Sequence, residues 1–71
     1  MRIKVDLESD ALYFRLSEDE IEESEEVSKG IVIDYSKAGK VIGVEILNVK
    51  EKFTLDELSK LNVELPTVAV K

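Results

Sequence analysis

The chain of 71 residues contains no cysteine and no histidine. This excludes disulfides, thiol nucleophiles, imidazole bases and zinc sites of the usual kind. Its three glycines, Gly30, Gly39 and Gly43, lie too far apart for a loop that cradles phosphate. No apolar run approaches the roughly 18 residues of a membrane-spanning helix. Charged residues interrupt the N-terminal segment, so it does not fit the hydrophobic region of a signal peptide. We expect a soluble, cytoplasmic protein without a cofactor, a metal site or catalytic residues.

Acidic residues outnumber basic ones by 16 to 10, so the formal net charge is −6. Nucleic acids and anionic membranes attract proteins mainly through Lys and Arg, and the sequence contains no clustered basic stripe. We therefore expect no direct contact with nucleic acid or membrane, whereas a basic protein would be attracted. Because 44% of the residues are hydrophobic, the chain is too apolar to be disordered.

The length predicts a single domain, residues 1–71. A chain of this size buries only about 60% of the surface that its unfolded form exposes. Small domains usually compensate with disulfides, a metal or association with another chain. Since the first two are disfavoured by the missing cysteine and histidine, a homodimer is the expected reinforcement.

Two segments at the N-terminus alternate polar and apolar side chains, which is the pattern of half-buried strands. They are residues 2–7 and residues 11–16, and the turn formers Glu8, Ser9 and Asp10 separate them. These segments predict a β-hairpin.

Residues 30–35 and 41–49 are rich in β-branched side chains and predict a second hairpin. A left-handed Gly39 in its turn places Asp34 opposite Ile42. In that register both faces are largely apolar, one with Val32, Ile42, Val44 and Ile46, the other with Ile31, Ile33, Tyr35, Val41, Leu47, Val49 and Glu45. A half-exposed antiparallel sheet has one polar face, so we expect a helix or a second copy to cover the other. The predicted core comprises Leu12, Phe14, Leu16, Val32, Val44 and Ile46.

The C-terminal part predicts one helix. Thr54 and Glu57 fit a capping box, Leu55, Leu58 and Leu61 form an apolar stripe, and Asn62 and Pro66 mark its end. The predicted fold class is α+β, an antiparallel sheet of about four strands with one C-terminal helix. The tail, residues 67–71, is β-prone, and three alternatives stand for it: it frays, pairs with a sheet edge or reaches another subunit.

Residues 18–26 hold seven carboxylates and a single apolar side chain, Ile21. Repulsion between like charges such as Glu18 and Glu22 opposes a helix, so we favour an extended loop, with an edge strand or a helix as alternatives. The loop is interpreted as a solvated segment or as a contact for a basic partner. A calcium loop of the EF-hand type needs a glycine that this segment lacks.

Glu45 lies within an apolar strand, where a carboxylate is costly unless it is paired. If the strand faces coincide, Tyr13 and Arg15 reach it, and Asp10 and Asp34 lie nearby. One interpretation is a structural ion pair or a half-exposed Glu. The other is that these five residues contact a ligand or partner. No catalytic role is assigned, because no nucleophile accompanies them.

Several of these segments resemble one known family. The run Asp10–Ser17, DALYFRLS, is similar to the D-A-L-Y-I-R-L-S core of the small prokaryotic proteins of domain-of-unknown-function family 2283. Glu25–Val27, Gly30–Tyr35 and Gly39–Leu47 continue the resemblance, which covers about residues 5–49. It implies no activity and no catalytic residues. Such proteins are often encoded beside small ribonuclease-type toxins, which implies an antitoxin-like role.

Three functions are compatible with these features. The first is a non-enzymatic binding protein, an antitoxin-like partner of a basic protein. The second is a module that responds to a small ligand or divalent cation through carboxylates near Glu45. The third is a structural homodimer.

Overall fold

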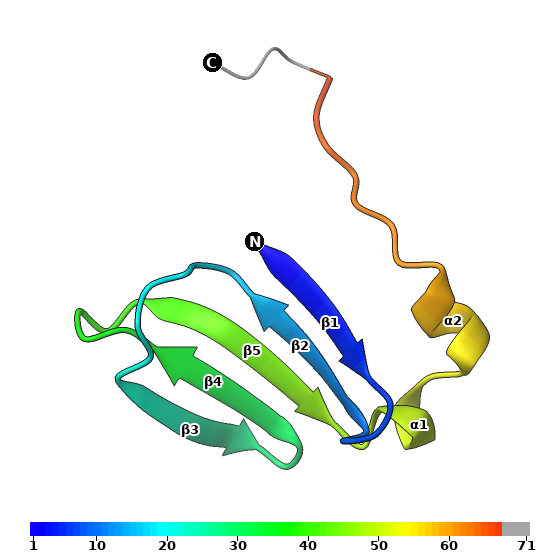
Figure 1. Ribbon diagram of the computed structural model, residues 1–71, viewed down its shortest axis with the longest axis horizontal. Helices are drawn as coiled ribbons and strands as arrows, with labels where there is room; N and C mark the ends of the chain where they lie inside the picture. Colours follow the sequence, from blue (N-terminus) through cyan, green and yellow to red (C-terminus); the bar gives the residue numbers. More distant parts are fainter. Residues whose placement is uncertain (68–71) are drawn as a thin grey trace.

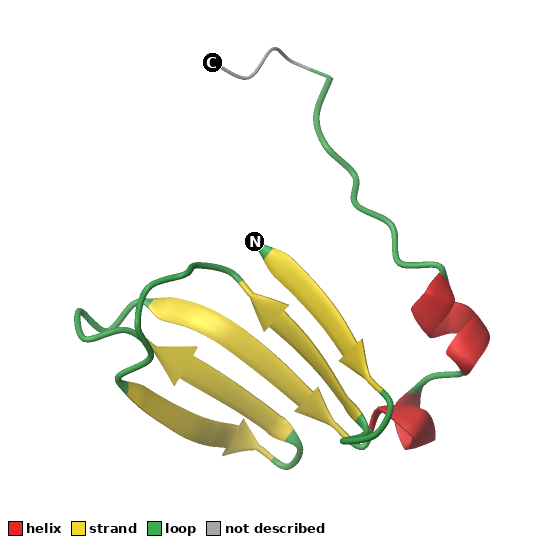
Figure 2. Cartoon of the chain, viewed as in Figure 1, coloured by secondary structure: helices red, strands yellow, loops and turns green. Residues whose placement is uncertain are grey.

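The computed structural model describes residues 1–67 and shows an α+β protein built on one antiparallel sheet (Figures 1 and 2). The elements follow the chain as β1 (Arg2–Asp6), β2 (Ala11–Arg15), β3 (Glu23–Ser28), β4 (Ile31–Tyr35), β5 (Val41–Leu47), α1 (Val49–Lys52) and α2 (Leu55–Ser59). The predicted fold class is confirmed, with one strand and one helix more than expected. Most of the β-prone tail, residues 68–71, lies outside the described residues.

The strands lie in the order β1-β2-β5-β4-β3, and all neighbouring pairs are antiparallel. The first predicted hairpin is β1–β2, and the second is β4–β5. In the turn of the second hairpin, Ser36 N donates to Lys40 O and Gly39 N donates to Ser36 O, both at 2.9 Å. Gly39 has a φ of 81°, the expected left-handed conformation, which glycine adopts without steric cost.

A β-bulge interrupts this second hairpin beside its turn and changes the predicted register. Tyr35 pairs with Val41, but Asp34 then pairs with Gly43 and not with Ile42. An extra residue in one strand shifts every pair beyond it by one position. The predicted register is therefore wrong beyond the first pair, because the hydrophobic pattern did not reveal the bulge.

The bulge gives the sheet one apolar and one polar face, since paired residues share a face. The "apolar face" consists of two rows of side chains across β1, β2, β5 and β4. One row is Ile3, Phe14, Val44 and Ile33, and the other is Val5, Leu12, Ile46 and Ile31. Glu45 pairs instead with Tyr13 and Val32 on the opposite face. The prediction of two largely apolar faces is wrong for the same reason as the register.

The second part of the acidic segment, residues 23–26, belongs to an edge strand, whereas residues 18–22 form the favoured extended loop. Residues 16–22 cross from β2 to β3, and within residues 1–67 β3 pairs with β4 alone. All six residues of β3 are exposed, and a second bulge lies between Glu26 and Ser28. Charged side chains and bulges are usual features of an exposed sheet edge.

The helices cover one corner of the apolar face. α2 begins at the predicted capping box, in which Thr54 Oγ1 accepts from Glu57 N at 3.1 Å and Glu57 Oε1 accepts from Thr54 N at 2.9 Å. It ends before the predicted stop and buries none of its own residues. Leu58 lines a groove of about 180 Å³ with Phe53 and Leu12 at the ends of the strands.

The buried core is small as a result. Among residues 1–67 the buried apolar side chains are Ala11, Leu12, Ile42 and Val49. Of the predicted core, Leu12 is buried, Leu16 is exposed, and Phe14, Val32, Val44 and Ile46 are half-buried. The core prediction is thus mostly wrong, because it assumed a covering layer that a single sheet with two short helices does not provide.

Candidate functional site

A hydrogen-bonded network on the polar face joins three of the five predicted site residues. The Tyr13 hydroxyl donates to Asp34 Oδ2 at 2.9 Å, and Arg15 Nη1 donates to the Tyr13 hydroxyl at 3.2 Å. The Ser24 hydroxyl donates to the other oxygen of Asp34 at 2.6 Å. The network runs from β2 across β5 to β4 and β3. It engages both oxygens of a carboxylate that is only 7% exposed.

Gly43 lies under the hydrogen bond between Tyr13 and Asp34. A Cβ at this position would lie 2.7 Å from the Tyr13 hydroxyl oxygen and 2.8 Å from Asp34 Oδ2. A glycine inside a strand often marks the close approach of a neighbouring group, and Gly43 has this role here. Only the bare backbone of β5 at this point lets a side chain from β2 reach one from β4.

Arg15 connects the network to the acidic segment. Its Nη2 donates to the backbone carbonyl of Asp19 at 2.7 Å, which fastens the crossing between β2 and β3. The hydrogen bond to the Tyr13 hydroxyl raises the pKa of Arg15, although partial desolvation opposes the shift. The buried Nε of this guanidinium has no hydrogen-bond partner within residues 1–67. Arg15 therefore positions the acidic segment against the sheet.

Ser24 is a member of the network that sequence reasoning missed. It belongs to the segment for which the sequence favours an extended loop. A residue in a loop has no fixed neighbour in a sheet, so the sequence did not link Ser24 to Asp34. Once β3 is a strand, Ser24 pairs with Asp34 on the same face. The available signal was its position as a small uncharged residue among glutamates.

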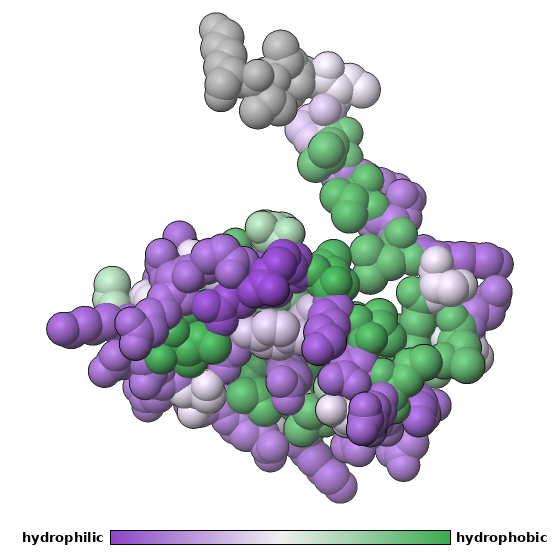
Figure 3. All heavy atoms as spheres, in the orientation of Figure 1, coloured by the Kyte–Doolittle hydropathy of each residue, from purple (hydrophilic) through white to green (hydrophobic). Residues whose placement is uncertain are grey.

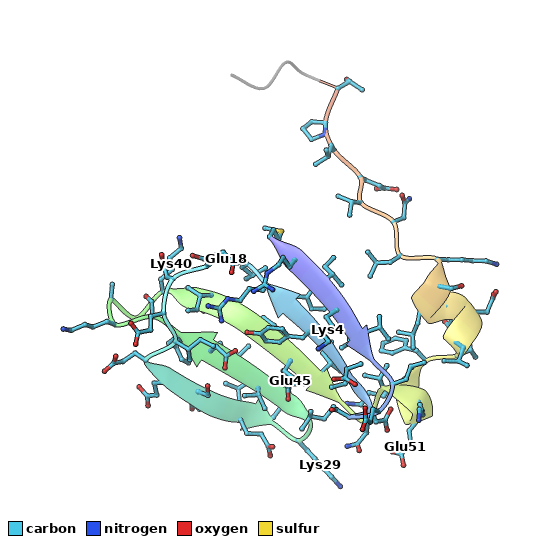
Figure 4. The ribbon with its side chains drawn as sticks, in the orientation of Figure 1. Lys4, Glu18, Lys29, Lys40, Glu45 and Glu51 are labelled. Carbon is cyan, nitrogen blue, oxygen red and sulfur yellow. The ribbon has the colours of Figure 1, made fainter. Side chains whose placement is uncertain are left out.

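Glu45 lies next to the network without joining it. It pairs with Tyr13 across β2 and β5 and is half-buried on the polar face. Figure 4 shows it on the same side of the sheet as Lys4. The shared face that was considered for Glu45 and Arg15 exists, but the hydrogen bonds of Arg15 go to Tyr13 and Asp19.

Asp10 lies away from the network, in the turn between β1 and β2. It has a φ of 55°, and its Oδ1 accepts from Lys50 N at 2.8 Å. Its carbonyl accepts from Val49 N at 3.2 Å. The residue that precedes α1, Asn48, makes no side-chain capping bond, so Asp10 caps this helix from a distant part of the chain.

The second notable surface is the "acidic edge", residues 18–26. Its seven carboxylates are exposed, and no basic residue occurs between Arg15 and Lys29. Arg2 donates from Nε and Nη2 to the two oxygens of Glu18 at 2.9 and 3.0 Å, and these bonds lower the Glu18 pKa. Because β3 is the last strand in the sheet order, one side of its backbone has no neighbouring strand among the described residues, 1–67.

The model of the family described as "Protein of unknown function (DUF2283)" matches residues 2–50. The chain belongs to this family. The match confirms the predicted resemblance and covers all five strands, the network and the acidic edge, whereas α2 lies beyond it. No curated protein and no solved structure matches the chain. Since the family description assigns no function, a functional proposal has to rest on the network and the acidic edge.

Two further observations bear on the chemistry of these surfaces. Within residues 1–67, no group of three or more His, Cys, Asp or Glu side chains is placed to hold a metal ion. In the same part of the chain, no helix is long and apolar enough to cross a membrane. The network can hold strands together, and the acidic edge can attract positive charge.

Proposed function

We propose that this protein is a non-enzymatic binding protein whose acidic edge occupies a basic surface of another protein, in the manner of an antitoxin. The observation that carries the proposal is the concentration of seven exposed carboxylates in one continuous segment, residues 18–26, which leads into the edge strand β3. Electrostatic complementarity of this kind speeds association and selects partners of opposite charge.

The backbone of β3 adds a second means of recognition. The strand pairs with β4 on one side only, and an extended segment of a partner can bond to the free N–H and C=O groups of an edge strand. Carboxylates on Glu23, Glu25 and Glu26 would then meet basic side chains of that segment. The same charges keep two copies of this edge from pairing with each other.

The network supports this role by holding the edge in place. Ser24 of β3 bonds to Asp34, and Arg15 bonds to the carbonyl of Asp19 in the crossing that leads to the edge. A binding surface that is already ordered loses less conformational entropy when its partner docks. The roles of Arg15, Tyr13 and Asp34 in this proposal are therefore structural.

The experiment is a pull-down from native lysate with the tagged full chain, followed by measurement of the affinity for each captured protein at several salt concentrations. A triple variant, Glu20→Gln/Glu22→Gln/Glu25→Gln, removes charge from the edge. The matched control is Glu8→Gln/Glu51→Gln/Asp56→Asn, which removes the same charge from exposed sites elsewhere.

The proposal predicts a basic partner whose affinity falls with added salt and falls at least tenfold in the edge variant but not in the control. Equal losses in both variants would mean that only the net charge matters. A partner that binds both variants as tightly as it binds the wild type would refute a role for the acidic edge.

A further inference from the structure

The apolar face is largely open in a single chain. Of its eight side chains only Leu12 is buried, at the corner where Leu58 of α2 lies beside it. Ile3 and Val5 are 39% and 37% exposed, and the other five are half-buried. Contiguous apolar surface of this kind is uncommon on soluble monomers and usually marks an interface.

Residues 60–67, called here the "arm", carry a second set of exposed apolar side chains, the first of which, Leu61, also lines the groove beside Leu12. Leu61, Val63 and Leu65 recur at every second position, which puts them on one side of an extended chain. Their exposed fractions are 46%, 65% and 79%. Figure 1 shows the arm leaving α2 and running away from its own sheet, and Figure 3 shows the hydrophobic residues along it.

The charges on these surfaces favour a second copy of the chain as the cover. The two rows of the apolar face contain no charged residue, although the chain as a whole has a net charge of −6. Two identical apolar faces can meet about a two-fold axis without opposing like charges at the centre. Closed two-fold dimers are the commonest homo-oligomers.

The area of the face indicates that the arm takes part. Four strands about 4.8 Å apart make the face about 19 Å wide, and two rows that each take about 7 Å along the strands make it about 14 Å long, which gives a footprint of about 270 Å². Two such faces hide roughly twice that, well below the roughly 1,200 Å² at the lower end of stable interfaces. The arm has eight residues and spans about 26 Å when extended, more than the width of the four strands. An exchanged arm supplies the missing contact.

We propose that the protein is a two-fold homodimer in which the apolar faces pack against each other and the arm of each copy, residues 60–67, lies against the other copy. This arrangement is independent of the proposed binding to a basic partner, because β3, the strand within the acidic edge, is at the far side of the sheet from α2 and the arm (Figure 1).

Sedimentation equilibrium on the full chain tests the proposal, with two interface variants and one control. Leu65→Asp alters the arm, and Ile3→Asp alters the apolar face. Both positions are exposed in the single chain, so the variants are expected to fold, which circular dichroism checks. Ala38→Asp adds the same charge in the exposed turn between β4 and β5.

The wild type is expected at twice the 8.0 kDa chain mass at micromolar concentration. The dissociation constant should rise at least tenfold for Leu65→Asp and for Ile3→Asp, and it should stay within twofold for Ala38→Asp. A mass of one chain at every concentration would overturn the dimer. A dimer that tolerates either interface variant as well as the control would overturn this arrangement of it.

Discussion

Replacing Gly43 with Ala should break the contact between Tyr13 and Asp34. The added methyl group would lie 2.7 Å from the Tyr13 hydroxyl oxygen and 2.8 Å from Asp34 Oδ2, so these atoms must separate. A hydrogen bond to a charged group contributes about 1.5–3 kcal/mol. Ala is intrinsically favoured over Gly in a strand by about 0.5–1 kcal/mol, which offsets part of the loss. We expect a net destabilisation of about 1–2 kcal/mol.

Tyr13→Phe removes the same bond without adding atoms, together with the bond from Arg15 Nη1 to the Tyr13 hydroxyl. We expect the loss of the bond to Asp34 to cost about 1.5–3 kcal/mol. In the double variant the bond is already absent, so the Ala methyl meets only Asp34. The two costs should therefore not add, and the coupling free energy should be at least about 1 kcal/mol.

Urea denaturation followed by far-UV circular dichroism measures all four free energies of unfolding. The protomer concentration must be the same in every sample, because self-association contributes to apparent stability. Additivity within about 0.5 kcal/mol would refute the conclusion that Gly43 serves this one contact.

Three further outcomes are expected. A hydrogen bond from the backbone of Ser9 lowers the Asp6 pKa. This carboxylate therefore stabilises the fold above its ordinary pKa of 3.8, and the stabilisation is lost as the pH falls through the lower pKa of the folded state. In an acid titration, the free energy of unfolding of Asp6→Asn should depend less on pH in this range. Asp10→Ala removes the cap of α1 and should lower the free energy of unfolding by about 0.5–2 kcal/mol in urea. Glu22→Gln/Glu23→Gln should leave the melting temperature unchanged or slightly higher, since it relieves repulsion along the acidic edge; a loss above about 2 kcal/mol would contradict this.

Local patterns predicted the elements well. Alternation identified the first hairpin, Gly39 identified the turn of the second, and Thr54 with Glu57 identified the start of α2. Each of these signals lies within a few residues of the feature that it specifies, so no knowledge of the rest of the fold is needed.

Features that depend on distant residues were predicted poorly. The bulge next to Gly43 leaves no mark in the hydrophobic pattern. Because the prediction lacked it, the residues of β4 were placed on the same face as the wrong residues of β5. The part of the acidic segment that lies in β3, residues 23–26, looked like a loop because it contains no apolar residue, yet β4 needs a partner for its outer backbone groups. Tyr13, Arg15 and Asp34 were singled out from sequence, but Ser24 depended on the pairing of β3.

The order of the strands divides the sheet into two parts that differ in how they form. The pairs β1–β2, β3–β4 and β4–β5 join segments that are adjacent in the chain, whereas β2–β5 joins Arg15 to Gly43 and Ala11 to Leu47. Closing this long loop brings the entropic cost of non-local pairing. The loop contains the acidic edge, whose carboxylates repel one another more strongly in dilute salt. The docking of the N-terminal hairpin onto β5 should therefore limit the rate of folding, and that rate should increase with ionic strength.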